Sequence, residues 1–280
     1  VSEAVKNISA HLRTHPGQKV YALSINDNGG HCRCAACVKL NGGSFPKHSR
    51  YGSHESHSES YYHWVNKVVG ELTKEFPDVL FGLLAYRGTI DPPSFRLHSN
   101  VVPFLCVDLH QLMDAKRLEN RHGLFRDWSE KATSFGIWDY GYGGPTYVPP
   151  RDYLSVQRTF FQLKKQYPAL NAFFAEGSSF IGEGPKRWWY YKLMADPFCD
   201  GEATLSKWYE ACCGEEAAPY LKSYYDEAEA FWTGENVRKT PWFRTVNNTY
   251  LNFNEMTYLF ALDESVMARM DALMDKVVAA

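Results

Sequence analysis

The sequence predicts an α/β protein whose parallel strands form a sheet or a barrel covered by helices. Continuous apolar runs of strand length alternate with segments whose apolar residues recur at helical spacing, a pattern typical of parallel strands covered by helices. Polar residues close each apolar run at its carboxyl end. We count five strands. The purely helical pattern after residue 185 predicts a C-terminal helical annex packed on the barrel or sheet.

One helix and one irregular crossover separate the first three strands. Val5, Ile8 and Leu12 predict a helix at residues 2–14, which Pro16 and Gly17 end. The connection at residues 87–100 is too rich in proline for a regular helix. The elements expected after the first helix are a strand at 19–25, a helix at 58–76, and strands at 79–86 and 100–108.

The later elements follow the same alternation and then become helical. Tyr153, Val156 and Phe160, for example, share one face of a predicted helix. We expect a helix at 123–132, a strand at 134–144, a helix at 151–166, a strand at 171–179, and helices at 186–198, 202–214, 215–232 and 254–278. These elements divide the chain into a barrel portion with the catalytic face, residues 1–185, and a helical C-terminal region, residues 186–280.

Composition excludes several classes of partner. The formal net charge is −2, so no electrostatic field draws the protein to nucleic acid or to an anionic membrane. No apolar run approaches the roughly 18 to 20 residues that cross a bilayer. Aromatic residues make up 15% of the chain, with 18 Tyr and 8 Trp, which suits sugar faces as well as a core. The chain begins at Val1 without Met, so we expect a piece of a longer multidomain protein.

Acidic and amide side chains stand at the carboxyl ends of the predicted strands. Strand ends of this kind converge on one face of a parallel α/β fold, where ligands bind. One acid after a strand is often only a helix cap, but four acids together would raise one another's pKa unless their chemistry were used. The residues at these ends are Asn26, Asp27 and Asn28, then Tyr86 and Arg87, Asp108 and His110, Trp138, Asp139 and Tyr140, and Glu176.

Two chemistries use such a cluster of carboxylates. In glycoside hydrolysis, one carboxylic acid protonates the leaving oxygen while a carboxylate attacks or activates water. A divalent-metal site would use the same oxygens as ligands. The neighbouring residues favour sugar. Trp138, Tyr140 and Tyr86 can stack on a pyranose ring, and the candidate hydrogen-bonding partners of its hydroxyls are Asn26, Asn28, Arg87, Asp108 and His110.

Three cysteines follow the first strand closely. Cys32, Cys34 and Cys37 offer three soft ligands within six residues, and a structural zinc site needs a fourth. His31, Cys106 or a histidine of the polar loop at residues 43–60 could supply it. In an oxidising compartment, two of these thiols, or one of them with Cys106, could form a disulfide instead. Both interpretations make this motif a scaffold for the loop after Asp27, and we assign no other cofactor.

Several blocks of the sequence together resemble a known family. They are "SINDNGGHCRCAAC", "HSNVVPFLCVD", "FGIWDYGYGG", "FFAEGSS" and "WWYYKLMADPFCD", and they keep their order over about residues 2–232. The chain is similar in these blocks to the DUF4838 domain, found in large, mostly bacterial proteins, often beside an α-glucuronidase N-terminal-like domain. The resemblance implies a glycoside-hydrolase-type (β/α)8 barrel, exported to the periplasm or outside the cell and acting on polysaccharide or glycan. The five predicted strands would then be only the later units of that barrel.

The resemblance also suggests roles for individual acids. It places the acid after the first strand at Asp27, the "IWDY" acid at Asp139, and the acid of the last strand at Glu176, whereas Gly177 stands where glutamine is usual. We expect Asp27 to be the general acid, and Glu176 or Asp139 to be the nucleophile or the water-activating base. A substrate-assisted mechanism, in which Asp27 orients an acetamido group, stays open. So do a non-catalytic carbohydrate-binding barrel and a metal-dependent hydrolase or zinc-stabilised module.

Overall fold

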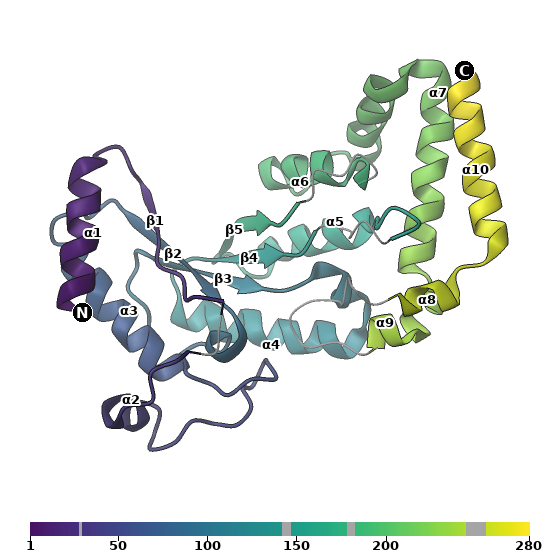
Figure 1. Cartoon of the computed structure of the whole chain (residues 1–280). Coiled ribbons are helices and arrows are strands. Elements are labelled where there is room, and N and C mark those ends of the chain that lie inside the picture. Colours follow the sequence, from purple (N-terminus) through teal and green to yellow (C-terminus); the bar gives the residue numbers. More distant parts are fainter. Residues whose placement is uncertain (28–29, 142–146, 178–182, 245–255) are drawn as a thin grey trace.

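A parallel five-stranded sheet forms the centre of the protein, as a computed structural model shows for residues 1–27, 30–141, 147–177, 183–244 and 256–280 (Figure 1). The strands are β1 (Val20–Ala22), β2 (Leu80–Ala85), β3 (Val101–Cys106), β4 (Phe135–Asp139) and β5 (Leu170–Ala175). Each strand pairs with the next one along the chain, so the spatial order is β1-β2-β3-β4-β5. Among the described residues β1 and β5 are the edges, and the sheet does not close.

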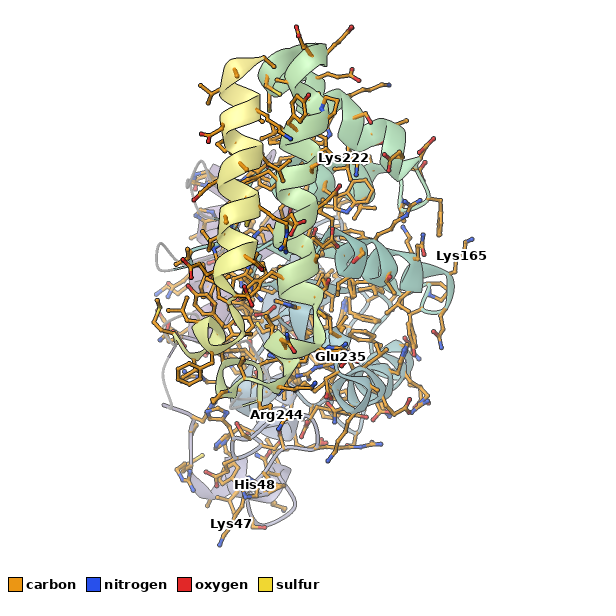
Figure 2. The ribbon with its side chains drawn as sticks, turned by 90° about the vertical axis from the view of Figure 1, so that its right-hand side faces the viewer. Lys47, His48, Lys165, Lys222, Glu235 and Arg244 are labelled. Atoms are coloured by element: carbon orange, nitrogen blue, oxygen red, sulfur yellow. The ribbon has the colours of Figure 1, made fainter. Side chains whose placement is uncertain are left out.

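Helices connect the strands and make up all the regular structure described after residue 185. They are α1 (Ser2–Thr14), α2 (Ala35–Leu40), α3 (Ser58–Leu72), α4 (Ala115–Lys131), α5 (Leu154–Gln162), α6 (Lys186–Ala195), α7 (Gly201–Thr233), α8 (Glu235–Lys239), α9 (Pro241–Arg244) and α10 (Glu264–Ala279). Short 3₁₀ turns lie at Arg87–Thr89, Leu109–Met113, Leu163–Lys165 and Thr257–Ala261. Figure 2 shows α10 running beside α7. None of the helices described is long and apolar enough to span a membrane.

One face of the sheet is fully covered. Phe81, Leu105 and Ile137 point to this face, and none of them is exposed. They belong to one core with residues of α1, α3, α4, α5 and α6. Removing this apolar surface from water drives the helices onto the sheet, at about 25 cal/mol for each Å² buried.

The opposite face carries the alternate residues and is much less covered. We call it the open face. Val20 and Leu80, which pair across β1 and β2, are 56% and 41% exposed, and Phe174 on β5 is 46% exposed. Leu84 and Trp138 are half-buried there. Continuous apolar strands predict that both faces are covered, so the open face departs from that expectation.

A β-bulge in β5 changes which residues reach the open face. Phe135 of β4 pairs with Leu170, whereas the next residue, Gly136, pairs with Ala172, so Asn171 is the extra residue. An extra residue reverses the alternation of every side chain beyond it. Phe174 therefore lies in register with Trp138 on the open face.

The core continues past residue 185. Trp189, Tyr190 and Leu193 of α6 are buried in the same core as the strands. A second core lies at the end of α7, where Tyr147, Trp232, Trp242 and Tyr258 pack together with Phe231, Val237 and Phe243. The predicted boundary at residue 185 therefore does not separate two cores, because α6 shares its core with the strands.

Local capping and packing account for several differences from the sequence-based elements. The helix predicted at 123–132 begins at Ala115, because the Asp114 carboxylate caps it by accepting a hydrogen bond of 2.9 Å from the Arg117 N–H. The polar loop at residues 43–60 packs against the protein, with Tyr51 and His57 buried. The crossover after β2 is irregular, as its prolines predict, and contains one 3₁₀ turn.

Candidate functional site

The carboxyl ends of the strands bring together residues of the open face. Tyr86, Cys106 and Tyr140 form a buried group, and Trp138 packs against them. We call these four residues, with Glu176, the strand-end cluster. They lie at or just beyond the carboxyl ends of β2, β3, β4 and β5, and they gather because parallel strands all present their carboxyl ends at the same edge of the sheet.

Glu176 is fixed at this edge by a tryptophan. The Trp138 Nε1–H donates a hydrogen bond of 2.7 Å to Glu176 Oε1. The indole ring also stacks on Phe174, with ring centroids 4.0 Å apart and planes 19° apart. Glu176 is half-buried, so its carboxylate is held in place while remaining accessible to a ligand.

Asp27 follows β1, at the other edge of the sheet from Glu176. Burial raises the pKa of the Cys106 thiol, and the negative charges of Glu176 and Asp27 raise it further. Asp27 and Asn26 are exposed. Asn28, another predicted sugar contact, lies outside the described residues.

Asp139 points away from the strand-end cluster, into the helix-covered side. Its carboxylate is not exposed, and it accepts hydrogen bonds from the Tyr190 hydroxyl and, at 2.8 Å, from the backbone N–H of Leu109. Burial and the nearby charge of Asp108 raise the pKa of Asp139 to about 7. A bound sugar on the open face would therefore not reach this carboxyl group.

Asp108 and His110 belong to a buried polar network. Arg151 Nη2 donates hydrogen bonds of 2.7 and 2.8 Å to the two oxygens of Asp108, and Arg151 Nε donates one of 3.2 Å to His110 Nδ1. His110 Nε2 is then the donor to the Trp232 carbonyl, at 2.8 Å. Burial and the Arg151 charge lower the pKa of His110 well below its usual value, so the ring is neutral.

This network joins the sheet to α7 and contains no exposed atom of Asp108 or His110. Both were predicted to contact substrate, but the structure pairs both of them internally. Arg87 differs, because it is half-buried and its guanidinium lies 5.1 Å from the centre of the Tyr86 ring. Arg87 lies at the rim of the strand-end cluster. Its backbone is in the left-handed conformation, with φ of 49°.

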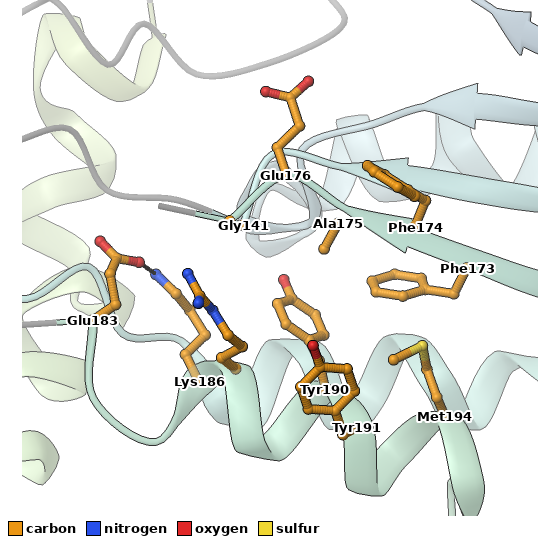
Figure 3. Close-up of a pocket in the computed structure, with 12 residues that line it drawn as sticks. Gly141, Phe173, Phe174, Ala175, Glu176, Glu183, Lys186, Tyr190, Tyr191 and Met194 are labelled. Carbon is orange, nitrogen blue, oxygen red and sulfur yellow. Dashed lines mark ion pairs between the residues drawn. The ribbon is translucent and has the colours of Figure 1, made fainter. Parts of the chain in front are cut away.

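A pocket of about 470 Å³ opens between β5 and α6 (Figure 3). Its floor is aromatic, and its far end is charged. The residues that line it are Gly141, Phe173, Phe174, Ala175, Glu176, Gly177, Glu183, Lys186, Arg187, Tyr190, Tyr191 and Met194. Figure 3 shows the Glu176 carboxylate pointing away from α6, so this residue borders both the pocket and the strand-end cluster.

Sequence reasoning missed the contribution of α6 to this pocket. The run "KRWWYY" has the composition of a packing helix, and Trp189 and Tyr190 are indeed buried. The signal that could have found the pocket is the pair Lys186 and Arg187 at the start of that aromatic run. Lys186 forms an ion pair with Glu183, whereas Arg187 is exposed at the pocket wall.

Cys32, Cys34 and Cys37 lie together, as their spacing predicts. Their three sulfur atoms are all within 4.8 Å of one another, and they are the one group of three or more potential metal ligands found in the described part of the chain. Cys106 does not join them, because it is the end residue of β3, buried beside Tyr140. All seven cysteines are thiols in the structure.

Comparison with known proteins gives one match. The model of a family described as "Domain of unknown function (DUF4838)" matches residues 1–226. No curated protein and no solved structure matches the chain.

Proposed function

The chain belongs to the DUF4838 family, and from this membership and the site geometry we propose that it is a glycoside hydrolase. The substrate would be the terminal residue of a polysaccharide or glycan. Its sugar ring would lie over the open face at the strand-end cluster. The family description assigns no reaction, so hydrolysis of a glycosidic bond is our own proposal.

The observation that carries the proposal is the Glu176 carboxylate, which Trp138 holds at the carboxyl end of β5 beside stacked aromatic rings. Flat apolar sugar faces stack on rings such as those of Trp138 and Phe174. A second carboxylate, Asp27, follows β1, and its charge and that of Glu176 both raise the pKa of Cys106 at the end of the central strand. Glycosidases use two carboxylates on opposite sides of the scissile bond, and Asp27 and Glu176 would be this pair.

The two acids take different roles. Asp27 is exposed at the rim and would donate a proton to the leaving oxygen. Glu176, held by Trp138, would be the nucleophile or would activate water. Asp139 is a positioning residue in this scheme, since its buried carboxylate contacts Tyr190 of the pocket wall on the helix-covered side of the sheet.

We also propose that the five strands are part of a complete (β/α)8 barrel. Their spatial order equals their sequence order, which is the order of strands in such a barrel. The exposed apolar residues of the open face would become interior once further strands of the parent protein curve around them. The sugar site would then be the mouth of that barrel.

The test is a panel of chromogenic glycosides and natural oligosaccharides, assayed with the 280-residue chain and with its parent protein. Asp27→Asn and Glu176→Gln should each lower turnover by at least about 10²-fold, the usual scale of acid-base catalysis. Asp78→Asn is the matched control, because Asp78 is exposed just before β2, at the opposite end of the sheet. Unchanged turnover in either site variant would remove that residue from the mechanism.

A carbohydrate-binding function without catalysis is the second candidate. The exposed Phe174 ring stacked on Trp138 favours it, because stacking alone is enough to bind a sugar. Under this alternative, oligosaccharides bind and change tryptophan fluorescence, Phe174→Ala weakens binding, and no bond is cleaved by either protein.

A further inference from the structure

We propose that Cys32, Cys34 and Cys37 bind one zinc ion, with water as the fourth ligand, because no fourth protein ligand joins the three sulfurs in the described part of the chain. This site is separate from the sugar site and does not depend on glycosidase activity. Its role is to fix the loop that follows Asp27.

The spacing of the sulfur atoms suits a metal better than a disulfide. Zinc–sulfur bonds of about 2.3 Å place the sulfurs of a tetrahedral site about 3.8 Å apart. The three sulfurs here lie within 4.8 Å of one another, so a small movement of the side chains would bring all three within bonding distance of one ion. A disulfide would join only two of them and leave the third thiol beside it.

The backbone holds the three thiols on one side of the loop. Cys34 is extended, with φ of −65° and ψ of 162°, and directly precedes α2, on which Cys37 lies. In an extended segment, alternate side chains point in opposite directions. Cys32 and Cys34 therefore face the sulfur group, while His31 and Arg33 face the protein.

His31 and Arg33 anchor this loop to the rest of the molecule. Arg33 donates hydrogen bonds of 2.7 and 3.0 Å to the two carboxylate oxygens of Glu55. The His31 ring stacks on the buried His57 ring, with centroids 4.2 Å apart. The backbone N–H of His57 donates in turn to the Gly88 carbonyl, at 2.7 Å.

Gly88 makes this contact possible and connects it to the candidate site. A Cβ atom at Gly88 would lie 2.6 Å from the Glu55 carbonyl and 3.3 Å from the His31 ring, so no larger residue fits. Gly88 directly follows Arg87 at the rim of the strand-end cluster. A metal on the three cysteines would thus stiffen both the loop after Asp27 and its contact beside Arg87.

The chemistry of the three side chains favours zinc. Zinc is bound by cysteine thiolates, and an ion among the three sulfurs would hold all of them deprotonated.

The first experiment measures metal content by mass spectrometry after purification of the untagged chain under reducing conditions. We expect one zinc per chain, retained on a weak chelating resin. Cys32→Ser, Cys34→Ser and Cys37→Ser should each lower this content. Cys212→Ser is the matched control, because Cys212 is exposed on α7, and it should keep the full content. Zinc lost equally from the wild type and from Cys34→Ser would be an adventitious ion only and would overturn the proposal.

The second experiment uses the wild-type chain, so a variant that fails to fold cannot confuse it. Cobalt exchanged into the site should give thiolate-to-cobalt charge-transfer absorption. A strong chelator should abolish it and make the chain susceptible to trypsin at Arg33 and Lys39, while α3 stays intact. No thiolate band, or two cysteines that resist alkylation until reduced, would overturn the zinc site and leave the glycosidase proposal standing.

Discussion

Three acids at the carboxyl ends of parallel strands differ in their exposure and in their partners. Glu176 faces the open face and stays accessible, held by Trp138. Asp139 faces the helices and is buried. Asp108 is buried too, but it is compensated by Arg151, and breaking such a pair costs about 3–5 kcal/mol. At the scale of the residue, the side of the sheet that a side chain faces decides that Glu176 can reach a ligand and that Asp139 cannot.

The raised pKa of Asp139 predicts a pH dependence of stability. The folded-state pKa is about 7, whereas an unfolded aspartate titrates near about 3.9. The folded state therefore binds the extra proton between these values. The contribution of Asp139 to stability is complete below about pH 4 and falls by about 1.4 kcal/mol per pH unit as the pH rises towards 7.

Asp139→Asn should remove this dependence, because the amide stays neutral while its oxygen can still accept from the Leu109 N–H. Urea unfolding of wild type and variant, measured from pH 4 to pH 8, would show a flatter profile for the variant. Asp78→Asn, an exposed acid, should keep the wild-type slope. Parallel profiles for wild type and Asp139→Asn would mean that Asp139 is ionised across this range.

At the scale of the element, α7 owes its bend to one glycine. Gly214 has φ of 85° and ψ of 165° inside an otherwise helical segment, in a region that only glycine occupies readily. Sequence patterns predict two helices, 202–214 and 215–232, and the interruption lies between them. The bend sets the direction of the second half of α7, which reaches the core around Trp232.

Two glycine-to-alanine substitutions should therefore have opposite effects. A Cβ atom meets nothing within 4 Å at either Gly214 or Gly70, so only the backbone differs. Gly214→Ala should destabilise the fold by about 1–3 kcal/mol. Gly70→Ala, inside α3, should stabilise it by about 0.5–1 kcal/mol. Thermal and urea unfolding would measure both, and equal signs would contradict this account of the bend.

The sequence predicts long elements well and short ones poorly. All five strands and the helices α1, α3, α5 and α6 are found where apolar periodicity predicts them. The helices α2, α8 and α9 have only four to six residues, too few to show a period. The meeting of Tyr86, Trp138, Tyr140 and Glu176 follows from their places after parallel strands.

Other parts of the site depend on facts that no local pattern contains. Asp139 and Glu176 each lie at the end of an apolar run, and only the register of the strands separates them. The Arg151 partner of Asp108 lies 43 positions away in the sequence. The pocket wall from α6 is built by long-range packing of a helix whose composition is that of an ordinary core element.

At the scale of the whole molecule, two cores are joined by a polar network. The main core crosses from the strands into α6. The second core surrounds Trp232, whose carbonyl accepts from His110. The sheet and the helical region therefore stabilise each other, whereas α10 has Met270 as its one buried residue in the structure.

Truncation should reveal this dependence. A chain of residues 1–185 loses Trp189, Tyr190 and Leu193 from the main core, so we expect no cooperative thermal transition and a loss of near-ultraviolet circular dichroism. A chain of residues 1–262 loses only α10 and should still unfold cooperatively. Cooperative unfolding of residues 1–185 alone would show that the barrel portion is an independent unit.

The bulge at Asn171 decides which side of the sheet Glu176 faces. If Asn171 instead entered the ladder opposite Gly136, every later residue of β5 would move by one position, so Ala175 would take the row beside Tyr140 and Glu176 would turn towards the helices. Deleting Asn171 would remove the bulge and still keep Glu176 in its row, because Leu170 and Ala172 already pair with the neighbouring residues Phe135 and Gly136. A relative can therefore preserve this glutamate in its sequence and yet bury it, so the pairing of the preceding strand should be inspected before the same role is proposed for it.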